Sequence, residues 1–215
     1  MRLPEPYCTN CQENVDVLGG SPLSIDVITL TRKPSKLRDW LTQYKGRTTD
    51  DDPFHPEYVP IVRAMLGRWL LENNATLGRR WGPTDALVPV PSTTPRDLPI
   101  HPLESILWSL ETDTPVRQLL RRGPGVIGWR QPAADGFIAQ TGPPLRVVLV
   151  DDVFVTGARI SSAAAALRHA GHDVVGVVEI ARRVNPDFDP GFQEFWDMQA
   201  PRPFSWRSER VQALS

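Results

Sequence analysis

Two adjacent aspartates, Asp151 and Asp152, stand between an aliphatic run and the small residues Thr156, Gly157 and Ala158. Paired carboxylates suit vicinal hydroxyls, a hydrated Mg²⁺ ion, or both. The small residues let an anion approach backbone N–H groups at the start of a helix, where the helix dipole favours negative charge. The types and spacing of these residues predict a site for a phosphate and a sugar.

A strand, an anion-binding turn and a helix must position these residues. Residues 147–150 form the unbroken β-branched and aliphatic run expected of a parallel strand covered on both faces. Residues 161–170 are rich in good helix formers and end before Gly171, and residues 174–181 read as a second strand. This βαβ unit predicts that the two aspartates point to opposite sides at the strand tip, where α/β sheets bind ligands.

The sequence Val-Val-Leu-Val-Asp-Asp-Val-Phe-Val-Thr-Gly-Ala-Arg at 147–159 resembles the phosphoribosyl pyrophosphate motif of type I phosphoribosyltransferases. The resemblance implies catalytic roles for Asp151 and Asp152, which would hold the ribose hydroxyls and, through ribose or water, Mg²⁺. It also implies a loop around the 5′-phosphate made of Val155, Thr156, Gly157, Ala158 and Arg159. Val155 and Arg159 replace the motif's usual hydroxyl side chains, and Arg159 is expected to add charge-assisted contacts to phosphate.

The order of the other elements resembles the ComF-like (competence protein F-like) family of this superfamily, which is associated with bacterial DNA uptake. Strands at 24–31 and 85–91, amphipathic helices at 36–45 and 59–73, and a Val-Pro-Val-Pro sequence at 88–91 precede the motif. The resemblance implies that the next loop binds pyrophosphate, and it adds four substrate-binding residues: Ser92, Thr93, Arg96 and Arg130. The sequence at 99–104 departs from the family's Arg-Gly-Phe-Asn-like element.

The segment 123–128 has the spacing Gly-x-Gly-x-x-Gly. We reject a dinucleotide-binding fingerprint because residues 116–122 are helix-like and the following residues contain Pro and Gly instead of a helix. Two interpretations stay open. The segment is either a mobile lid that excludes water from the site, with Arg121, Arg122 and Arg130 neutralising phosphate, or a plain linker.

Cys8 and Cys11 form a single Cys-x-x-Cys knuckle, which supplies two of the four ligands of a structural zinc. His55 and His101 are candidates to complete such a site, but both lie in Pro-containing loops without diagnostic spacing. The pattern leaves weak Zn²⁺ binding and free thiols as alternatives, and we favour free thiols.

The composition excludes several classes of protein. A chain of 215 residues with a formal net charge of −1 has no electrostatic footprint for nucleic acid or membrane. No apolar run approaches the length of a membrane span and the N-terminus lacks a signal-peptide core, so we expect a cytoplasmic protein. A homodimer is an open alternative.

We therefore expect an α/β protein with the type I phosphoribosyltransferase fold, a central, mainly parallel sheet flanked by helices. Residues 1–23 would form a small N-terminal extension, 24–184 the phosphoribosyltransferase-like domain, and 185–215 an aromatic-rich, hood-like segment packed on it.

The leading functional hypothesis is a Mg²⁺-dependent ComF-like transferase that moves phosphoribose from phosphoribosyl pyrophosphate to an unidentified acceptor and releases pyrophosphate. One alternative is a non-catalytic sensor or adaptor that binds a phosphorylated ribose nucleotide. Another is a structural protein in which the Cys8–Cys11 knuckle organises assembly with a partner and the ligand site is vestigial.

Overall fold

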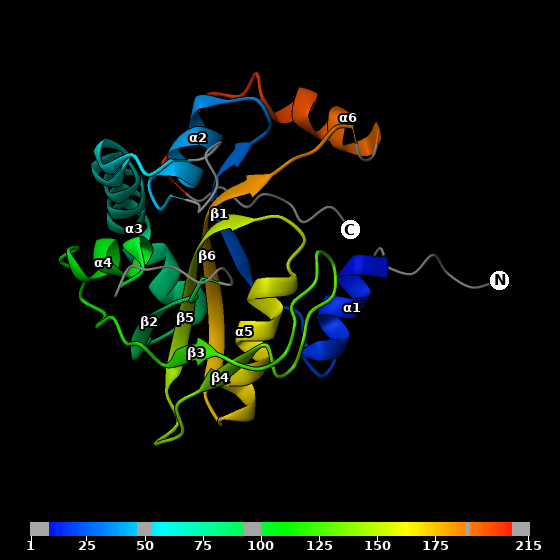
Figure 1. The fold of residues 1–215 in the computed structure, drawn as a ribbon. Helices are drawn as coiled ribbons and strands as arrows, with labels where there is room; N and C mark the ends of the chain where they lie inside the picture. Colours follow the sequence, from blue (N-terminus) through cyan, green and yellow to red (C-terminus); the bar gives the residue numbers. More distant parts are fainter. Residues whose placement is uncertain (1–8, 47–52, 93–99, 188–189, 208–215) are drawn as a thin grey trace.

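A four-stranded parallel sheet forms the centre of the protein (Figure 1). The computed structural model describes residues 9–46, 53–92, 100–187 and 190–207. The strand order is β1 (Ile25–Thr31), β6 (Asp173–Arg183), β5 (Arg146–Phe154) and β2 (Ala86–Pro89). The expected α/β class, with a mainly parallel sheet between helices, is confirmed.

The βαβ unit predicted from residues 147–181 is present as β5, α5 (Ala158–His169) and β6. The strand is longer than its aliphatic run, because β5 continues through both aspartates to Phe154. Asp151 and Asp152 therefore lie inside a paired strand, and the expectation that they sit at its tip is wrong. Asp151 is in register with Glu179 on β6.

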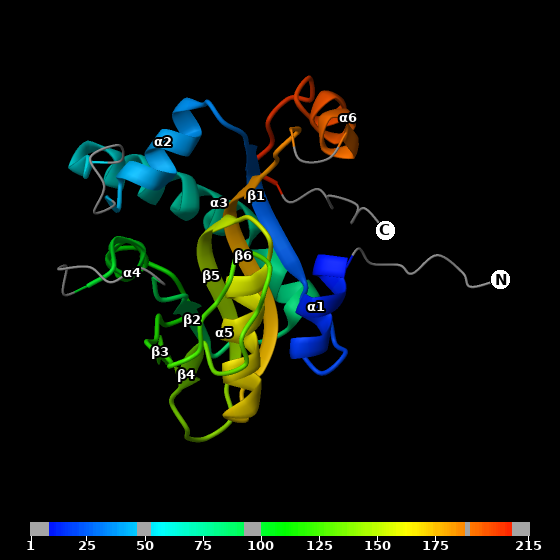
Figure 2. The ribbon, with the colours of Figure 1, turned by 45° about the vertical axis from the view of Figure 1, so that its right-hand side comes forward.

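Helices cover both faces of the sheet, as Figures 1 and 2 show from two sides. On one face, α2 (Lys36–Gln43), α3 (Val59–Trp81) and α4 (Pro102–Trp108) pack against side chains such as Val148 and Ile180. On the other face, α5 packs against Val147 and Leu149, and so do the last residue of α1 (Thr9–Val17) and the following Leu18. The sheet is thus buried between two apolar layers, which explains the continuous apolar runs of its central strands.

The expectation of a helix over residues 116–122 is wrong. Pro115 and the β-branched Val116 favour an extended chain, and backbone hydrogen bonds join this segment to Leu87 of β2. The chain then forms β3 (Leu120–Arg122), which pairs antiparallel with β4 (Phe137–Ala139).

The glycine-rich segment is part of the hairpin that joins β3 to β4. The N–H of Gly123 donates to Gly136 O at 3.0 Å, and the N–H of Gly125 donates to Asp135 O at 3.1 Å. A Cβ atom at Gly123 would overlap the Asp135 carbonyl group. The first glycines of the segment therefore serve close packing inside a hairpin arm, and no helix follows them.

Helix α3 is longer than expected and runs past Gly78 to Trp81. Gly82, with φ +71°, ends it and donates its N–H to Gly78 O at 3.0 Å.

After β6, α6 (Pro190–Gln199) lies beside the C-terminal end of β1 (Figure 2). No helix in the described part of the chain combines the length and apolar character needed to cross a membrane.

Candidate functional site

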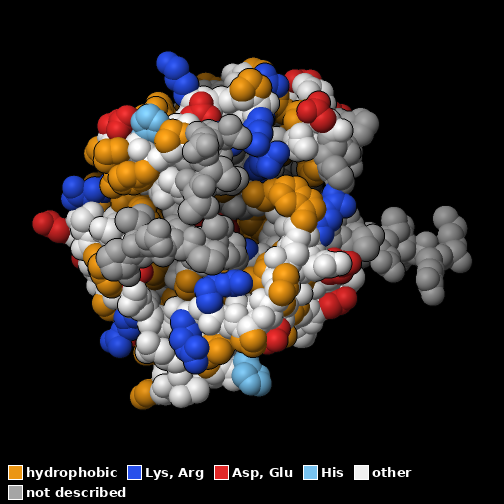
Figure 3. Space-filling model, viewed as in Figure 1, with side chains coloured by type: hydrophobic (Ala, Val, Ile, Leu, Met, Phe, Trp, Pro, Cys, Tyr) orange, Lys and Arg blue, Asp and Glu red, His pale blue; other side chains and the backbone are white. Residues whose placement is uncertain are grey.

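A cavity of about 420 Å³ lies at the carboxyl edge of the sheet. One part of the cavity wall comes from the end of β1 and from α2, and another from residues 151–160 together with Glu179 and Arg183 of β6. The third part is residues 127–129 of the hairpin arm, the segment 123–136 between β3 and β4. This is the edge at which parallel α/β sheets bind ligands. In the view of Figure 3, Lys and Arg side chains lie above and below the middle of the molecular face.

The floor of the cavity includes the N-terminal turn of α5. Gly157 precedes the helix with φ +85°, a left-handed conformation that suits glycine, and no side chain caps the helix. The positive, N-terminal end of the α5 dipole therefore lies at the cavity, together with the N–H groups of the first helical turn. A Cβ atom at Gly157 would lie 2.7 Å from Asn14 Nδ2 and 3.1 Å from the Phe154 ring.

Contacts from distant segments hold this turn. Asn14 of α1 donates its Nδ2–H to Thr156 O at 2.8 Å, and the Thr156 hydroxyl donates to Trp129 O at 2.5 Å. The hairpin arm is also tied to α5, because the N–H of Ala133 donates to Ser162 Oγ at 2.9 Å. The turn is therefore clamped between α1 and the hairpin.

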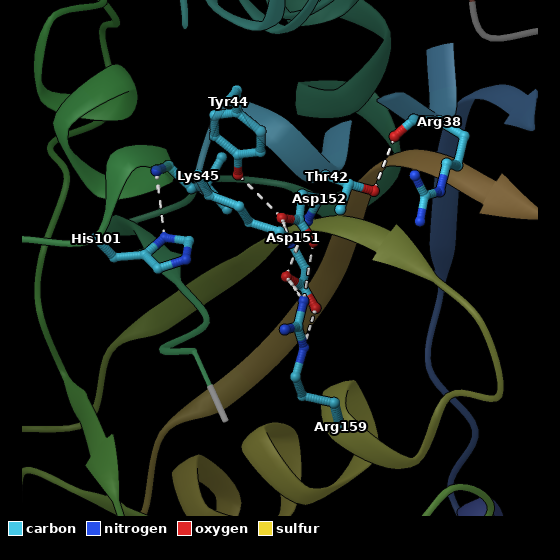
Figure 4. Close-up of polar contacts among 9 residues, drawn as sticks. Arg38, Thr42, Tyr44, Lys45, His101, Asp151, Asp152 and Arg159 are labelled. Carbon is cyan, nitrogen blue, oxygen red and sulfur yellow. Dashed lines mark hydrogen bonds and ion pairs between the residues drawn. The ribbon is translucent and has the colours of Figure 1, made fainter. Parts of the chain in front are cut away.

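The two aspartates form the centre of a buried ionic cluster (Figure 4). Arg159 extends from α5 toward both of them: Nε donates to Asp151 Oδ2 at 2.8 Å, and Nη2 donates to Asp151 Oδ1 and, at 3.1 Å, to Asp152 Oδ1. From the other side, the Tyr44 hydroxyl donates to Asp152 Oδ2 at 2.9 Å and Lys45 Nζ pairs with the same oxygen. One guanidinium thus spans two carboxylates that were expected to diverge.

Burial and ion pairing act in opposite directions on these groups. Burial alone would raise the pKa of Asp152, but Lys45 and Arg159 outweigh it and hold the pKa well below the ordinary value. Burial raises the pKa of Asp151, although Arg159 opposes that change. Burial and then Asp152 raise the pKa of Tyr44, whereas burial lowers the pKa of Lys45. Asp152 is therefore the anionic centre of the cluster.

Glu179 is a third carboxyl group in the cavity wall. Its side chain is buried, and neither oxygen has a hydrogen-bond partner. Burial, and next the neighbouring Asp151, raise its pKa well above the ordinary value of 4.5. A neutral carboxylic acid is the form that this environment favours.

The charges that line the cavity favour an anionic ligand. The cationic side chains are Lys33, Arg38, Lys45, Arg159 and Arg183. Five cationic side chains line the cavity together with two aspartates and Glu179, and the raised pKa of Glu179 favours its neutral form. The remaining positive charge suits phosphate groups.

The aspartate pair does not fit a magnesium site in this arrangement. Each of the four carboxylate oxygens already accepts from Arg159, Lys45 or Tyr44. Both residues are at most 2% exposed. Among the described residues, no group of three or more His, Cys, Asp or Glu side chains is arranged to hold a metal ion. An ion at the pair would have to displace one of its present partners.

The structure brings one part of the predicted site together. Seven predicted residues line the cavity: Asp151, Asp152, Val155, Thr156, Gly157, Ala158 and Arg159. Ser92 and Arg130 do not line it, and Thr93 and Arg96 lie outside the described residues. Arg159, expected to contact phosphate, pairs with the aspartates instead.

The residues proposed for zinc are not assembled into a site within the described segments. Cys11 is exposed on α1, and Cys8 lies outside the described residues. His55 contacts Glu57 at 2.8 Å and stacks on Tyr58. His101 caps α4 by accepting from the N–H of Leu103 at 3.2 Å.

Sequence reasoning missed several residues around the aspartate pair. The sequence pattern places Tyr44 and Lys45 only within the amphipathic helix expected at 36–45. Their contacts with Asp152 cross more than a hundred residues, and no local pattern signals them. Glu179 did carry a signal, because an acidic residue inside an apolar strand is rarely buried without a partner.

Comparison with known proteins gives only distant similarities. No family model and no curated protein matches the chain. A UMP synthase of Leishmania donovani is similar with a TM-score of 0.40 and 19% identity over 75% of this chain, which spans only 33% of that protein. An adenine phosphoribosyltransferase from Leishmania tarentolae has a TM-score of 0.36 and 15% identity, covering 73% of this chain and 91% of its own. A second, from Leishmania donovani, has a TM-score of 0.36 and 18% identity, covering 84% and 80%.

Proposed function

We propose that this chain binds phosphoribosyl pyrophosphate in the cavity and acts as a ComF-like phosphoribosyltransferase on an unidentified acceptor. The observation that carries the proposal is the β5–turn–α5 unit. It places an uncapped helix N-terminus, a left-handed Gly157 and the two aspartates along one cavity. This arrangement supplies backbone donors for a phosphate beside carboxylates for a sugar.

The proposed ligand fits the distribution of charge. The 5′-phosphate would bind at the turn formed by residues 155–159, where the helix dipole and N–H groups favour an anion. The pyrophosphate would lie toward Lys33, Arg38 and Arg183, which also line the cavity. The ribose would lie between these two anionic ends, next to Asp151 and Asp152.

The proposed reaction needs electrostatic stabilisation more than a protein nucleophile. The bond between the anomeric carbon and the pyrophosphate oxygen breaks, its electron pair leaves with pyrophosphate, and an acceptor atom bonds to the carbon. Positive charge develops on the ribose while the leaving group becomes more negative. Carboxylates near the sugar stabilise the positive charge, and cations near the pyrophosphate stabilise the negative charge.

A non-catalytic sensor of a phosphorylated ribose is the second candidate. The ion pairs of Arg159 favour it, because they occupy the oxygens with which Asp151 and Asp152 would hold ribose hydroxyls. A sensor needs only the phosphate turn and the cationic wall. A transferase must also open the carboxylates to the sugar.

Titration calorimetry with phosphoribosyl pyrophosphate, with and without Mg²⁺, tests the site. We expect binding to wild-type protein that weakens at least about tenfold, or 1.4 kcal/mol, in Asp151→Asn with Asp152→Asn. Asp113→Asn, on the surface away from the cavity, is the matched control. Absence of binding, or undiminished binding to the double variant, would reject the site.

Pyrophosphate release in the presence of a panel of nucleobases separates the two candidates. A base-dependent release supports the transferase. Binding without release by any base supports the sensor.

A further inference from the structure

Arg159 makes the most extensive set of contacts with the aspartate pair. Its Nε and Nη2 atoms contact both oxygens of Asp151, and Nη2 also reaches Asp152. The residue lies in the first turn of α5, and its side chain is 24% exposed. The guanidinium therefore lies between the carboxylates and also lines the cavity.

The positive and negative charges of the cluster balance each other without an added ion. Lys45 and Arg159 supply two positive charges to Asp151 and Asp152, and ion pairs join all four groups. A planar guanidinium matches two carboxylate oxygens at once, which makes its pairing strong and directional. A divalent cation at the same place would compete with a cation that is covalently part of the protein.

We infer that Arg159 takes the place of a divalent cation at Asp151 and Asp152, so that the site holds its phosphorylated ligand without bound metal. The ligand part of this inference rests on the proposed function. The metal part does not, because it concerns only the affinity of the aspartate pair for a divalent ion.

The rest of the cavity supports a metal-free site. Lys33, Arg38 and Arg183 line it in addition to the two cations of the cluster. A metal usually screens the charge of a polyphosphate, and here the cationic side chains of the cavity wall would contribute that screening. Mg²⁺ in solution would lower the charge of the ligand and weaken its attraction to these side chains.

Electron paramagnetic resonance with Mn²⁺ alone tests the metal part. Wild-type protein is expected to bind no Mn²⁺ up to ~1 mM, a concentration that covers weak protein sites for divalent ions. Arg159→Thr, which exposes both carboxylates, should bind at least about tenfold more tightly. Arg79→Thr, on the exposed side of α3, is the control and should match wild type.

Two outcomes overturn this part: sub-millimolar binding of Mn²⁺ to wild type, or no gain in Arg159→Thr while circular dichroism shows that the variant is folded. If Arg159→Thr does not fold, the wild-type measurement still decides, together with Arg159→Lys, which keeps the charge and should also bind no Mn²⁺.

Calorimetry with inorganic pyrophosphate and with phosphoribosyl pyrophosphate tests the ligand part. Affinity in EDTA should equal or exceed the affinity in Mg²⁺ for wild type, and Arg159→Thr should bind only in Mg²⁺. A wild-type protein that binds only in Mg²⁺ overturns the inference. If neither compound binds in either condition, the proposed function and the ligand part both fail, and the Mn²⁺ result still decides the metal part.

Discussion

At the scale of single residues, Asp152 organises the site. Its two oxygens accept from Tyr44, Lys45 and Arg159, which come from two separate parts of the chain. Buried charges of this kind are tolerated when each has a partner, and removing one partner leaves another charge unpaired. The contribution of each partner can therefore be measured by removing it singly.

Tyr44→Phe removes one neutral donor and leaves both ion pairs of Asp152 in place. We expect the free energy of unfolding to fall by about 1–2 kcal/mol, because a buried hydrogen bond to a charged acceptor is lost. Urea denaturation measures this change. Tyr58→Phe is the control, since the ring of Tyr58 stacks on His55 outside the cluster, and an equal loss in both variants would contradict the assignment.

Glu179 predicts an unusual dependence of stability on pH. Its pKa in the folded protein lies well above 4.5, the ordinary value that applies to the unfolded chain. Below pH 4.5, the folded and the unfolded chain therefore both hold the proton. Above it, the unfolded chain releases the proton while the folded chain keeps it. Stability therefore falls as pH rises through this window, by at most about 1.4 kcal/mol per pH unit.

Glu179→Gln should remove this slope, because glutamine does not titrate. Urea denaturation at pH 5 and at pH 7 would show a smaller difference for the variant than for wild type. Glu194→Gln, on an exposed position of α6, serves as the comparison and should keep the wild-type difference. The same pH response in Glu179→Gln and wild type would rule out this explanation.

At the scale of elements, the sequence predicted what depends on local pattern. The apolar runs of β5 and β6 and the helix formers of α5 identify their elements because each signal lies within the element itself. The helix expected at 116–122 failed because a backbone pairing with Leu87 determines that segment. The partners of Asp152 were missed for the same physical reason, since they are distant in sequence.

The turn before α5 depends on glycine at position 157. Gly157→Ala would place a Cβ atom 2.7 Å from Asn14 Nδ2 in a left-handed conformation. We expect a loss of about 1–2 kcal/mol in stability, because alanine is strained there, together with weaker binding of phosphoribosyl pyrophosphate. Urea denaturation and calorimetry measure the two effects.

Gly78→Ala is the matched control for that prediction. Gly78 lies inside α3, and nothing lies within 4 Å of the Cβ atom it would gain. Alanine should stabilise the helix by about 0.5–1 kcal/mol and leave binding unchanged. If Gly157→Ala behaved like Gly78→Ala, the turn would not need its left-handed conformation.

At the scale of the whole molecule, one close approach joins α3 to the sheet. The Trp81 ring packs on Gly176 of β6, where a Cβ atom would lie within 2.6 Å of three ring atoms. The Trp81 indole N–H also donates to Ser24 Oγ at 3.3 Å, which ties the end of the helix to the segment before β1. The distance between the helix layer and the sheet is therefore set by a glycine.

Gly176→Ala should force the Trp81 ring away from β6. Overpacking in a core costs about 1–3 kcal/mol, and we expect a loss of that size in urea denaturation. The near-ultraviolet circular dichroism of the tryptophans should change as well. Gly142→Ala, with open space around its Cβ atom, should change neither quantity, and a silent Gly176→Ala would show that the layers can separate without cost.

The cavity walls come from the beginning, the middle and the end of the chain: β1 and α2, the hairpin arm, and the β5–α5–β6 unit. A molecule bound there would act as an additional cross-link between segments that are distant in the sequence. At a concentration of 100 times its Kd, it would add about 2.7 kcal/mol to the stability of the folded state. The melting temperature can thus serve as a reporter, and a library of phosphorylated metabolites can be screened for the natural ligand before any reaction is known.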